Sequence, residues 1–519
     1  MNQPSKKSVE DVKKFISDSG ADRIVEEIKL KLTRNGSLPV YSDIYKVENG
    51  RTFQYVNYVQ EGGGVLGVAL AGYTYVLEKL GFRFLKLAGT SAGAINTMML
   101  ASIEKENYPE LKESDVDTQS EIIVYEMLNK NLWELVDGSR FGKWIIRMSI
   151  YNKRRLGFLI SLLKYSIAFP LMYAVFQLIQ NAFSWPLSPA VNSILDVIAV
   201  TSVVILILYI IIILIYLAKF SKAHFGINPG NDFYDWMKSI LEKNKIRNTS
   251  DLENLMEKRF AEIKLRDHPD RTGLEKTTVM VRPYITIITS DTTNQIKVEF
   301  PKMAEQYWTS TRFAEISPAC FVRASMSIPV FFAPFRITVD ESVIEKSFIQ
   351  QSRLVAKQFY KAKSIKPETH NYQVYFVDGG ILSNFPMSVF HNPQIKIARM
   401  PTFGVRLEDE KHVEGEQVVN KKLKFFPYLY KIFNTVRFNY DKDFLSKNAV
   451  YEQCIGHIDV EKFNWLDFGL GDNIKSELFL KGAEAAKTFF LGGEVWIKGR
   501  KSYFEPFDWE KYKSERAKI

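Results

Sequence analysis

The chain has 519 residues, of which 46% are hydrophobic and 25% are charged. This composition is typical of a chain that folds around a hydrophobic core, and it excludes an intrinsically disordered protein. The formal net charge of +10 suits an anionic membrane surface, and we expect no nucleic-acid partner because further basic clusters are absent. Cys320 and Cys454 have no metal-ligand spacing, which predicts two buried thiols in a reducing compartment.

We expect residues 1–52 to form a helical segment that precedes the main domain. Apolar residues recur at helical spacing between residues 7 and 33, among many charges, and predict a surface helix. The basic residues at the start are not followed by an apolar run, so the N-terminus is not typical of a secretory signal. We therefore expect it to stay in the cytosol.

Two strand–turn–helix units follow from residue 53. FQYVNYV predicts a strand, EGGGVLG a glycine turn, and VALAGYTYVLEKLG a helix that ends at Gly81. A second strand, RFLKLAG, leads through GTSAG into a second helix. Strands that alternate with helices imply an α/β fold with a parallel sheet and helices on its faces.

Residues 156–218 differ in kind from the rest of the chain. Val197–Ala218 is a run of 22 residues without a charge, and at about 1.5 Å per residue it matches a hydrocarbon core of roughly 30 Å. Tyr165–Phe183 is also uncharged but contains Pro170, so the sequence leaves open whether 156–183 crosses fully. Basic residues flank both outer ends, and by the positive-inside rule these ends face the cytosol.

These features predict a transmembrane helical hairpin whose two ends, and the domain attached to them, lie on the cytosolic side. A helix buried on all sides of a large core is the alternative interpretation. Beyond the hairpin, PYITIITSDTTNQIKVEF predicts two more strands, so the sheet continues. The hairpin is thus expected to be an insertion at 156–218 within one domain of residues 53–498, with a polar C-terminal tail at 499–519.

GTSAG has the features of a nucleophile elbow, in which a strand turns sharply into a helix. Gly89 and Gly93 leave room for the neighbouring backbone, and the strained turn lifts the hydroxyl of Ser91 above the sheet. The following helix directs amide dipoles towards an anion that forms there. By itself this motif is also found in plain glycine turns, but the strand–turn–helix setting favours a nucleophilic serine.

The glycine turn at Gly62, Gly63 and Gly64 fits two kinds of site. Together with Gly67 it matches the dinucleotide-binding pattern G-x-G-x-x-G, but no acidic residue follows at residues 81–92, where a ribose would be held. The favoured interpretation is an oxyanion hole, in which consecutive glycine amides point at a tetrahedral intermediate.

Asp378, Gly379 and Gly380 follow the apolar run YFV, so a carboxylate stands where a strand ends in a loop. D-G-G alone is only a turn signal. Ligands of parallel sheets gather at the carboxyl ends of the strands, however, so we expect Asp378, Ser91 and the glycine turn to converge there.

EGGGVLG, GTSAG and VDGGILSNFP, in this order, resemble the three signatures of patatin-like phospholipases. ACFVRASMSIPVFFAPF and the closing KGAEAAKTFFL are similar to segments of those proteins as well. The resemblance covers about residues 53–492, interrupted by the hairpin and by a charged stretch at 340–371. One departure is Glu61, which stands where many relatives have aspartate.

The resemblance implies a three-layer α/β/α sandwich and a Ser–Asp dyad without histidine, formed by Ser91 and Asp378. It implies an oxyanion hole from Gly62, Gly63 and Gly64, and hydrolysis of acyl esters in membrane phospholipids or other glycerolipids without metal or cofactor. The oligomeric state stays open.

Two alternatives stay open as well. One is an α/β-hydrolase-type esterase with a Ser–Asp–His triad that uses His391 or His457, although the glycine turn ends only 27 residues before Ser91 with a single helix between. The other is a non-catalytic membrane scaffold that binds lipid.

Residues 421–447 combine lysines and arginine with aromatic residues. Such a segment suits a lipid interface, with rings in the headgroup layer. A solvated helix that packs its rings on the sheet is the slightly favoured interpretation.

Overall fold

The computed structural model describes residues 7–34, 36–111, 116–183, 188–260, 263–266, 282–339, 343, 373–395, 398–408, 425–497 and 500–518. Most of the charged stretch at 340–371, and the lysines at 421, 422 and 424, lie outside the described residues. The chain divides into two compact units. The main unit comprises Met1–Leu135, Gly230–Ile328 and Pro334–Ile519, and the inserted unit comprises Val136–Pro229 and Pro329–Ala333.

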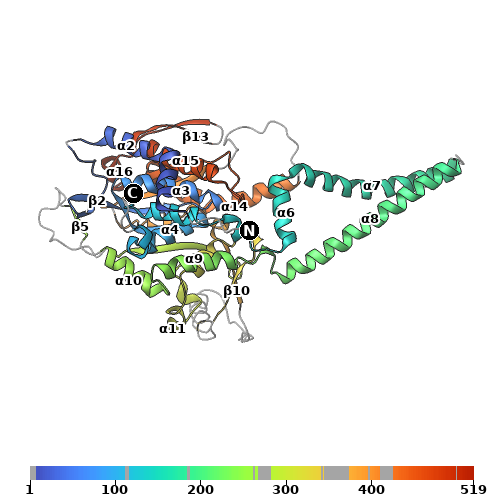
Figure 1. The fold of residues 1–519 in the computed structure, drawn as a ribbon, viewed down its shortest axis with the longest axis horizontal. Coiled ribbons are helices and arrows are strands. Elements are labelled where there is room, and N and C mark those ends of the chain that lie inside the picture. Colours follow the sequence, from blue (N-terminus) through green and yellow to red (C-terminus); the bar gives the residue numbers. More distant parts are fainter. Residues whose placement is uncertain are drawn as a thin grey trace. The chain divides into compact units, whose positions relative to one another are not determined.

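A central sheet forms the core of the main unit (Figure 1). Its described strands are β1 (Ile44–Glu48), β2 (Arg51–Gln60), β3 (Phe82–Thr90), β5 (Lys264–Leu265), β6 (Tyr284–Asp291), β7 (Ile296–Phe300), β9 (Phe335–Thr338), β10 (Gln373–Asp378), β11 (Thr402–Glu408) and β12 (Ile455–Asp459). The main path runs in the order β12-β11-β2-β3-β6-β10-β9. Outside this path, β1 pairs with β2, β5 pairs with β1, and β7 pairs with β6.

The prediction of a parallel sheet is correct for one part and wrong for the other. Strands β12, β11, β2, β3 and β6 are parallel to their neighbours. Strands β10, β9, β7 and β1 are antiparallel to theirs, so the sheet is mixed. The predicted pair of strands at PYITIITSDTTNQIKVEF is confirmed as the antiparallel pair β6 and β7, because a tight turn can only connect antiparallel strands.

Helices complete a mixed α/β fold that is consistent with an α/β/α arrangement. Those of the main unit are α1 (Val9–Ser19), α2 (Ala21–Leu32), α3 (Gly67–Lys79), α4 (Ala92–Ser102), α5 (Gln119–Leu128), α9 (Asn231–Lys243), α10 (Thr249–Arg259), α11 (Ser310–Phe313), α12 (Ala319–Ser325), α14 (Phe425–Lys447), α15 (Asp472–Leu491) and α16 (Trp509–Arg516). Helices α3 and α15 meet through glycine: a Cβ at Gly72 would lie 2.0 Å from the Phe479 carbonyl oxygen, and one at Gly482 would lie 1.9 Å from that of Ala69. The two backbones therefore approach more closely than side chains would allow.

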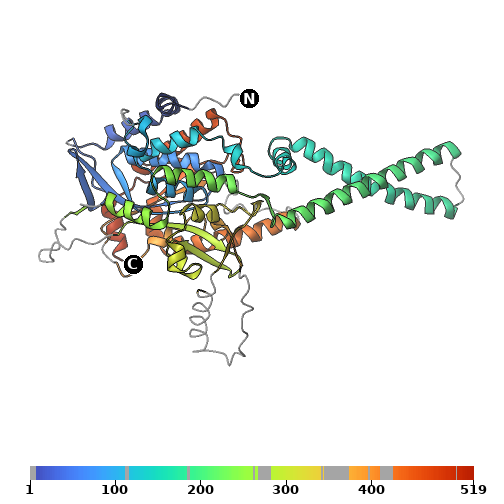
Figure 2. The ribbon, with the colours of Figure 1, turned by 60° about the horizontal axis from the view of Figure 1, so that its bottom comes forward.

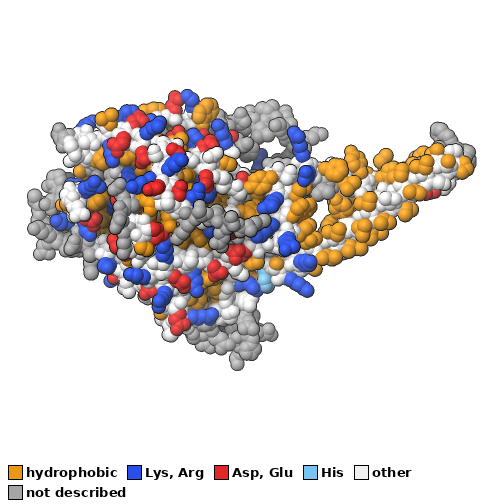
Figure 3. Space-filling view, viewed as in Figure 1, with side chains coloured by type: hydrophobic (Ala, Val, Ile, Leu, Met, Phe, Trp, Pro, Cys, Tyr) orange, Lys and Arg blue, Asp and Glu red, His pale blue; other side chains and the backbone are white. Residues whose placement is uncertain are grey.

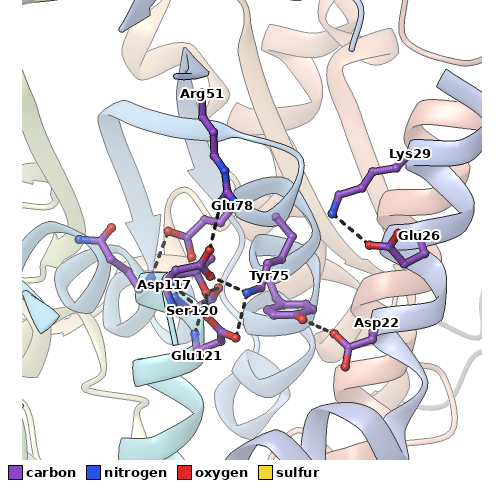
Figure 4. Close-up of polar contacts among 12 residues, drawn as sticks. Asp22, Glu26, Lys29, Arg51, Tyr75, Glu78, Asp117, Ser120 and Glu121 are labelled. Atoms are coloured by element: carbon purple, nitrogen blue, oxygen red, sulfur yellow. Dashed lines mark hydrogen bonds and ion pairs between the residues drawn. The ribbon is translucent and has the colours of Figure 1, made fainter. Parts of the chain in front are cut away.

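A polar cluster ties the start of α5 to α2 and α3 (Figure 4). The buried carboxylate of Glu78 accepts hydrogen bonds from the backbone N–H of Ser120 at 2.7 Å and of Gln119 at 3.3 Å. Tyr75 donates to Asp22 on α2. Burial raises the pKa of the Glu78 carboxyl, so these hydrogen bonds stabilise a charge that the core would otherwise disfavour.

Both ends of the chain contribute more structure than the sequence predicts. The expected surface helix is two helices, α1 and α2, separated at Gly20, whose φ of 83° ends the first one. Residues 44–48 are a strand, and Asn49 and Gly50, both with positive φ, connect it to β2 as an antiparallel pair. The predicted polar tail contains β14 (Arg500–Phe504), paired with β13 (Gly493–Ile497), and α16, where Trp509 is buried.

The inserted unit consists mainly of helices: α6 (Arg140–Tyr151), α7 (Lys153–Phe183) and α8 (Pro189–Lys222). Strands β4 (Gly226–Asn228) and β8 (Val330–Phe332) form a short parallel pair. Helices α7 and α8 run side by side and cross (Figures 1 and 2), and Tyr173 on α7 donates a hydrogen bond to Asp196 on α8.

Helices α7 and α8 expose apolar side chains along their length (Figure 3). By length and composition alone, the segments Ile160–Phe183 and Pro189–Lys222 could each cross a membrane. Only 6% of either apolar window is buried within the protein, so the alternative of a core helix buried on all sides is wrong.

Candidate active site

Ser91 occupies the sharp turn between β3 and α4. Its backbone has φ 51° and ψ −117°, a conformation that side-chain-bearing residues rarely adopt. The backbone N–H of Ser91 donates to Ser325 Oγ at 2.9 Å, which fixes the turn from α12. A strained serine at a strand-to-helix turn is the geometry of a nucleophile elbow, as the sequence predicts.

The two glycines that flank Ser91 are required by close backbone approach. A Cβ at Gly89 would lie 2.3 Å from the Gly93 carbonyl oxygen. A Cβ at Gly93 would lie 2.3 Å from the carbonyl oxygen of Gln60, at the end of the neighbouring strand β2. Both distances are too short for any side chain, so the elbow can pack against β2 only with glycine at these positions.

Asp378 lies at the end of β10, level with the elbow. Asp378 pairs with Thr289 on β6, whose preceding residue, Ile288, pairs with Thr90 on β3. The expected convergence with Ser91 is present, but the reason we gave for it is wrong. Strand β10 is antiparallel to β6, so its carboxyl end reaches the elbow from the opposite direction to the parallel strands.

Burial dominates the electrostatics of Asp378. It raises the pKa of the Asp378 carboxyl above the ordinary value for aspartate. Three groups favour the charged form and oppose the rise: the Ser91 hydroxyl, the Gly380 N–H and the Arg437 guanidinium. The influence of the Ser91 hydroxyl on the pKa of this carboxyl makes the two side chains neighbours in the site.

The two carboxylate oxygens of Asp378 have different surroundings. Oδ1 accepts a hydrogen bond of 2.7 Å from the Gly380 N–H. Oδ2 is buried and, among the described residues, has no hydrogen bond of standard geometry. The Ser91 hydroxyl itself lies 3.5 Å from Met326 Sδ, a weak acceptor that leaves its proton available for Asp378.

The three glycines of the turn after β2 are not equivalent. The Gly62 N–H already donates to the Asn384 carbonyl oxygen at 3.1 Å. For Gly63 and Gly64, the described part of the chain offers their N–H groups no acceptor. Next in the turn, the Val65 N–H is taken by the Trp465 carbonyl oxygen at 3.0 Å. The amides that can bind an anion in this turn are therefore those of Gly63 and Gly64.

Glu61 and Asn384 join the glycine turn to the loop after Asp378. Asn384 Nδ2 donates to Glu61 Oε1 and to the Gly62 carbonyl oxygen, both at 3.1 Å. Glu61 Oε2 accepts a 2.6 Å hydrogen bond from the Leu407 N–H on β11. The departure at Glu61 thus acts on the turn, and Asn384 connects the two halves of the site.

Helix α14 holds the loop after Asp378 from the other side. Arg437 Nε donates to the Gly380 carbonyl oxygen at 3.1 Å. The buried carboxylate of Asp441 accepts from the Ser383 hydroxyl at 2.7 Å and from the Phe385 N–H at 2.8 Å. Arg437 and Asp441 lie more than 50 residues beyond the D-G-G motif, so no local pattern predicts their contacts with this loop.

The histidines named for a triad have other partners. His391 Nδ1 is 3.0 Å from the Tyr451 hydroxyl, and His457 Nδ1 is 2.7 Å from Glu408 Oε1. Neither ring has a hydrogen bond to Ser91 or Asp378 within the residues that the structure describes. In the same residues, no group of three or more His, Cys, Asp and Glu side chains is arranged to hold a metal ion.

Comparison with known families identifies this arrangement. The model of the patatin-like phospholipases matches residues 59–391, which is more than half of the chain and includes the glycine turn, the elbow and the D-G-G loop. The chain belongs to the patatin-like phospholipase family. For this patatin-like chain, family membership supports lipid acyl hydrolase activity and lipid substrates at the level of the family.

A curated relative aligns with nearly the whole patatin-like chain. The uncharacterized protein YqhO of Bacillus subtilis (strain 168) is 22% identical over 441 residues, covering 84% of this chain and 98% of its own length. Among solved structures, VipD from Legionella pneumophila has 14% sequence identity and a TM-score of 0.28, covering 88% of this chain and 72% of its own. At that TM-score the similarity carries no argument about fold or function.

Proposed function

We propose that this protein is a membrane-anchored lipid acyl hydrolase that cleaves carboxylic esters of glycerolipids, including phospholipids, through a dyad of Ser91 and Asp378. The observation that carries the proposal is the strained Ser91 at the β3–α4 turn beside the buried Asp378. A serine hydroxyl is a weak nucleophile unless an adjacent base accepts its proton. A carboxylate with a raised pKa is a better base than an ordinary aspartate.

In the first step, Ser91 Oγ attacks the ester carbonyl carbon while its proton passes to Asp378. The carbonyl oxygen becomes an oxyanion that the free N–H groups of Gly63 and Gly64 stabilise, each worth about 2.7–4 kcal/mol in the transition state. The intermediate then collapses, and the alcohol part of the lipid leaves with the proton held by Asp378. The acyl group stays on Ser91 as an ester.

In the second step, water hydrolyses the acyl-enzyme. Asp378 accepts a proton from the water as the hydroxide equivalent attacks the acyl carbonyl carbon. Collapse of this second intermediate breaks the bond to Ser91 Oγ, which takes the proton back, and the fatty acid is released. The same two side chains act in both steps, so no histidine is required.

The proposed oxyanion hole uses the amides of Gly63 and Gly64, whereas the sequence suggested all three glycines of the turn. Gly62 is proposed as a spacer that packs against Ser91, since its amide is engaged by Asn384 and a Cβ there would lie 3.0 Å from that of Ser91. A dinucleotide is disfavoured because residues 81–92 contain no acidic residue to hold a ribose.

The inserted unit supports the membrane anchor. Asp196 lies 23 residues before Lys219 on α8, or about 35 Å along the helix, which exceeds a hydrocarbon core of roughly 30 Å. The first acidic residue and the first basic residue outside the apolar run can therefore face opposite surfaces of a bilayer. With Arg155 and Lys219 at the cytosolic end, the proposed hairpin keeps the patatin-like domain in the cytosol.

The test compares Ser91→Ala and Asp378→Asn with the wild type in the full-length protein. Both variants are expected to reduce hydrolysis of a soluble p-nitrophenyl ester and of vesicle phospholipid by at least roughly 10³-fold, because one loses the nucleophile and the other its base. A fluorophosphonate probe should label the wild type but not Ser91→Ala. His391→Gln and His457→Gln serve as matched controls and should retain the activity.

Three results count against the proposal. A folded His391→Gln or His457→Gln protein that is as inactive as Ser91→Ala would replace the dyad with a triad. Failure of the wild type to react with the fluorophosphonate would favour a non-catalytic lipid-binding scaffold. Release of the intact wild type from membranes by alkaline carbonate would contradict the membrane anchor but not the hydrolase activity.

A further inference from the structure

Helix α14 has one side directed at the active-site loop. Arg437 and Asp441 on this side make the hydrogen bonds to the loop after Asp378, and Leu445 is buried on the same helix. Residues four positions apart lie on the same face of a helix, so these contacts fix both the position and the rotation of α14. The opposite side of the helix is therefore presented outward in a defined orientation.

The outward side of α14 carries an apolar stripe. The stripe consists of Tyr428, Ile432, Val436 and Tyr440, which recur every four residues and are 45%, 44%, 56% and 47% exposed. Phe444 on the same helix packs against His391 and Tyr451, whereas the rings of Tyr428 and Tyr440 are about half exposed. Four exposed large side chains on one helical face leave apolar area in water, which a soluble surface helix would avoid.

Cationic side chains border the stripe. Lys431 and Lys442 are exposed on α14, one turn or less from the apolar positions. On β7, Lys297 Nζ lies 4.5 Å from the centre of the Tyr440 ring. Tyrosines stand at both ends of the stripe, where their rings can lie among acyl chains and their hydroxyls among headgroups. This combination complements an anionic lipid surface better than the apolar surface of a protein partner.

We propose that the stripe on α14 binds the surface of an anionic phospholipid bilayer and holds the active-site loop against it. This rests on the proposed function, since the substrate is then a lipid of the bilayer to which the stripe binds. The proposed lipid contact would also position the active-site loop, because the residues of the stripe and those that hold the loop are on the same helix. The hairpin would retain the enzyme at the membrane, and the stripe would orient it.

The first experiment measures whether the stripe contacts lipid. Val436→Cys is labelled with an environment-sensitive bimane fluorophore in full-length protein reconstituted into phosphatidylcholine vesicles, with or without phosphatidylglycerol. Both native cysteines, Cys320 and Cys454, are free and buried, as the sequence predicts, so they should react slowly. The label at Val436 is expected to shift to the blue, more strongly with phosphatidylglycerol. Leu30→Cys on α2, where the native side chain is 83% exposed, is the matched control and should not shift.

The second experiment measures whether the contact matters for activity. Ile432→Asp and Lys431→Glu should each lower hydrolysis of phosphatidylglycerol-containing vesicles roughly tenfold, because each weakens binding to an anionic surface. Hydrolysis of the soluble ester should be unchanged in both. Leu30→Asp, with the same kind of change elsewhere on the surface, should leave both activities unchanged.

The outcomes separate this inference from the proposed function. The inference is overturned if the Val436 label does not shift in either kind of vesicle, or if Ile432→Asp hydrolyses vesicles as fast as the wild type. A blue shift that appears without vesicles and depends on protein concentration assigns the stripe to a second copy of the chain. In each of these cases, labelling by fluorophosphonate and turnover of the soluble ester would persist, so the hydrolase assignment would stand.

Discussion

The loops around Ser91 and the helices α7 and α8 differ in what their side chains contact. Around Ser91, the hydroxyls, carboxylates and amides are buried, and most are joined by hydrogen bonds to residues of neighbouring loops, helices and strands. Along α7 and α8, large apolar side chains are exposed. Buried polar groups are costly unless they are paired, and exposed apolar helices are costly unless lipid covers them.

This difference indicates that the two regions determine separate properties, namely catalysis and location at the membrane. Under the proposed function, the loops decide whether the chemistry can occur, since their atoms are positioned by contacts within the main unit. Under the same proposal, the apolar helices decide where it occurs, since their surface suits a bilayer. Changes in one region should therefore leave the property set by the other intact, and the following predictions test that separation from the largest expected effect to the smallest.

Replacing residues 156–218 by a short Gly/Ser linker should separate the two properties most strongly. Hydrolysis of bilayer phospholipid is expected to fall roughly 100-fold, because the linker variant is no longer held at high effective concentration beside its substrate. Turnover of a soluble ester should persist, and the variant should be recovered without detergent. Parallel assays on vesicles and on a p-nitrophenyl ester measure both quantities.

An unfolded linker variant would contradict the separation, because the inserted unit would then be needed to form the active site. Circular dichroism and fluorophosphonate labelling report folding independently of lipid. A folded variant that hydrolyses vesicles as fast as the wild type would show instead that anchoring has no role in catalysis at membranes.

Asn384→Ala should reduce turnover with little loss of binding. The change removes both hydrogen bonds that join Glu61 and the Gly62 carbonyl oxygen to the loop after Asp378. Only the backbone hydrogen bond from the Gly62 N–H to the residue 384 carbonyl oxygen would then join the oxyanion donors to the loop of the base. With this weaker connection, kcat should fall roughly tenfold to a hundredfold while KM changes little. Steady-state kinetics on a soluble ester check this split.

Asn57→Ala is the matched control, since Asn57 is a buried amide of the same sheet that donates to Thr402 and does not join the two loops. It should lower the melting temperature without a selective fall in kcat. If Asn384→Ala also loses only stability, then Asn384 is a structural residue and does not position the site.

Arg437→Gln should move the pH dependence of the reaction. Burial raises the pKa of Asp378 and the Arg437 guanidinium opposes that rise, so loss of this charge raises the pKa further. The base must be ionised, and activity therefore falls as the pH drops through this pKa. The acidic limb of kcat/KM should shift to higher pH in the variant, and a pH profile on the soluble ester measures it.

Arg437→Lys retains the charge and is the control, which should keep the acidic limb near that of the wild type. If the acidic limb of the kcat/KM profile does not shift in Arg437→Gln, this limb reflects the ionisation of a group other than Asp378. Equal shifts in both variants would point to the lost hydrogen bond to Gly380 instead of the charge.

Local patterns in the sequence were sufficient to predict much of the fold and the motifs that meet at the site. GTSAG between a strand and a helix predicts the elbow, because its glycines are imposed by neighbouring backbone. The strand at residues 44–48 could also have been predicted, since Asn49–Gly50 between two apolar runs is a hairpin signal that we overlooked. The antiparallel direction of β10 could not, because it depends on pairing with a strand more than 80 residues away.

The residues that hold the site together were beyond local patterns for a similar reason. Asn384 is within the predicted D-G-G segment, but its partner Glu61 is 323 residues away in the chain. Arg437 and Asp441 are part of a segment whose lysines and aromatic residues suggested only a lipid contact or a solvated helix packed on the sheet. Their contacts follow from tertiary packing, which spacing along one sequence does not specify.

The position of the inserted unit in the chain also sets an order of synthesis. Ser91 and Asp378 are 287 residues apart, and α7 and α8 are made between them. At about 5–20 residues per second, the base leaves the ribosome roughly 15–60 s after the nucleophile. The apolar helices are complete before β6 and β10 exist, so under the proposed anchoring a nascent chain would enter the bilayer while its sheet still lacks the strand that carries Asp378. Such a chain would become able to cleave lipids only after it had been delivered to them, and a ribosome-bound chain truncated before residue 373 should therefore be resistant to carbonate extraction yet unreactive towards fluorophosphonate.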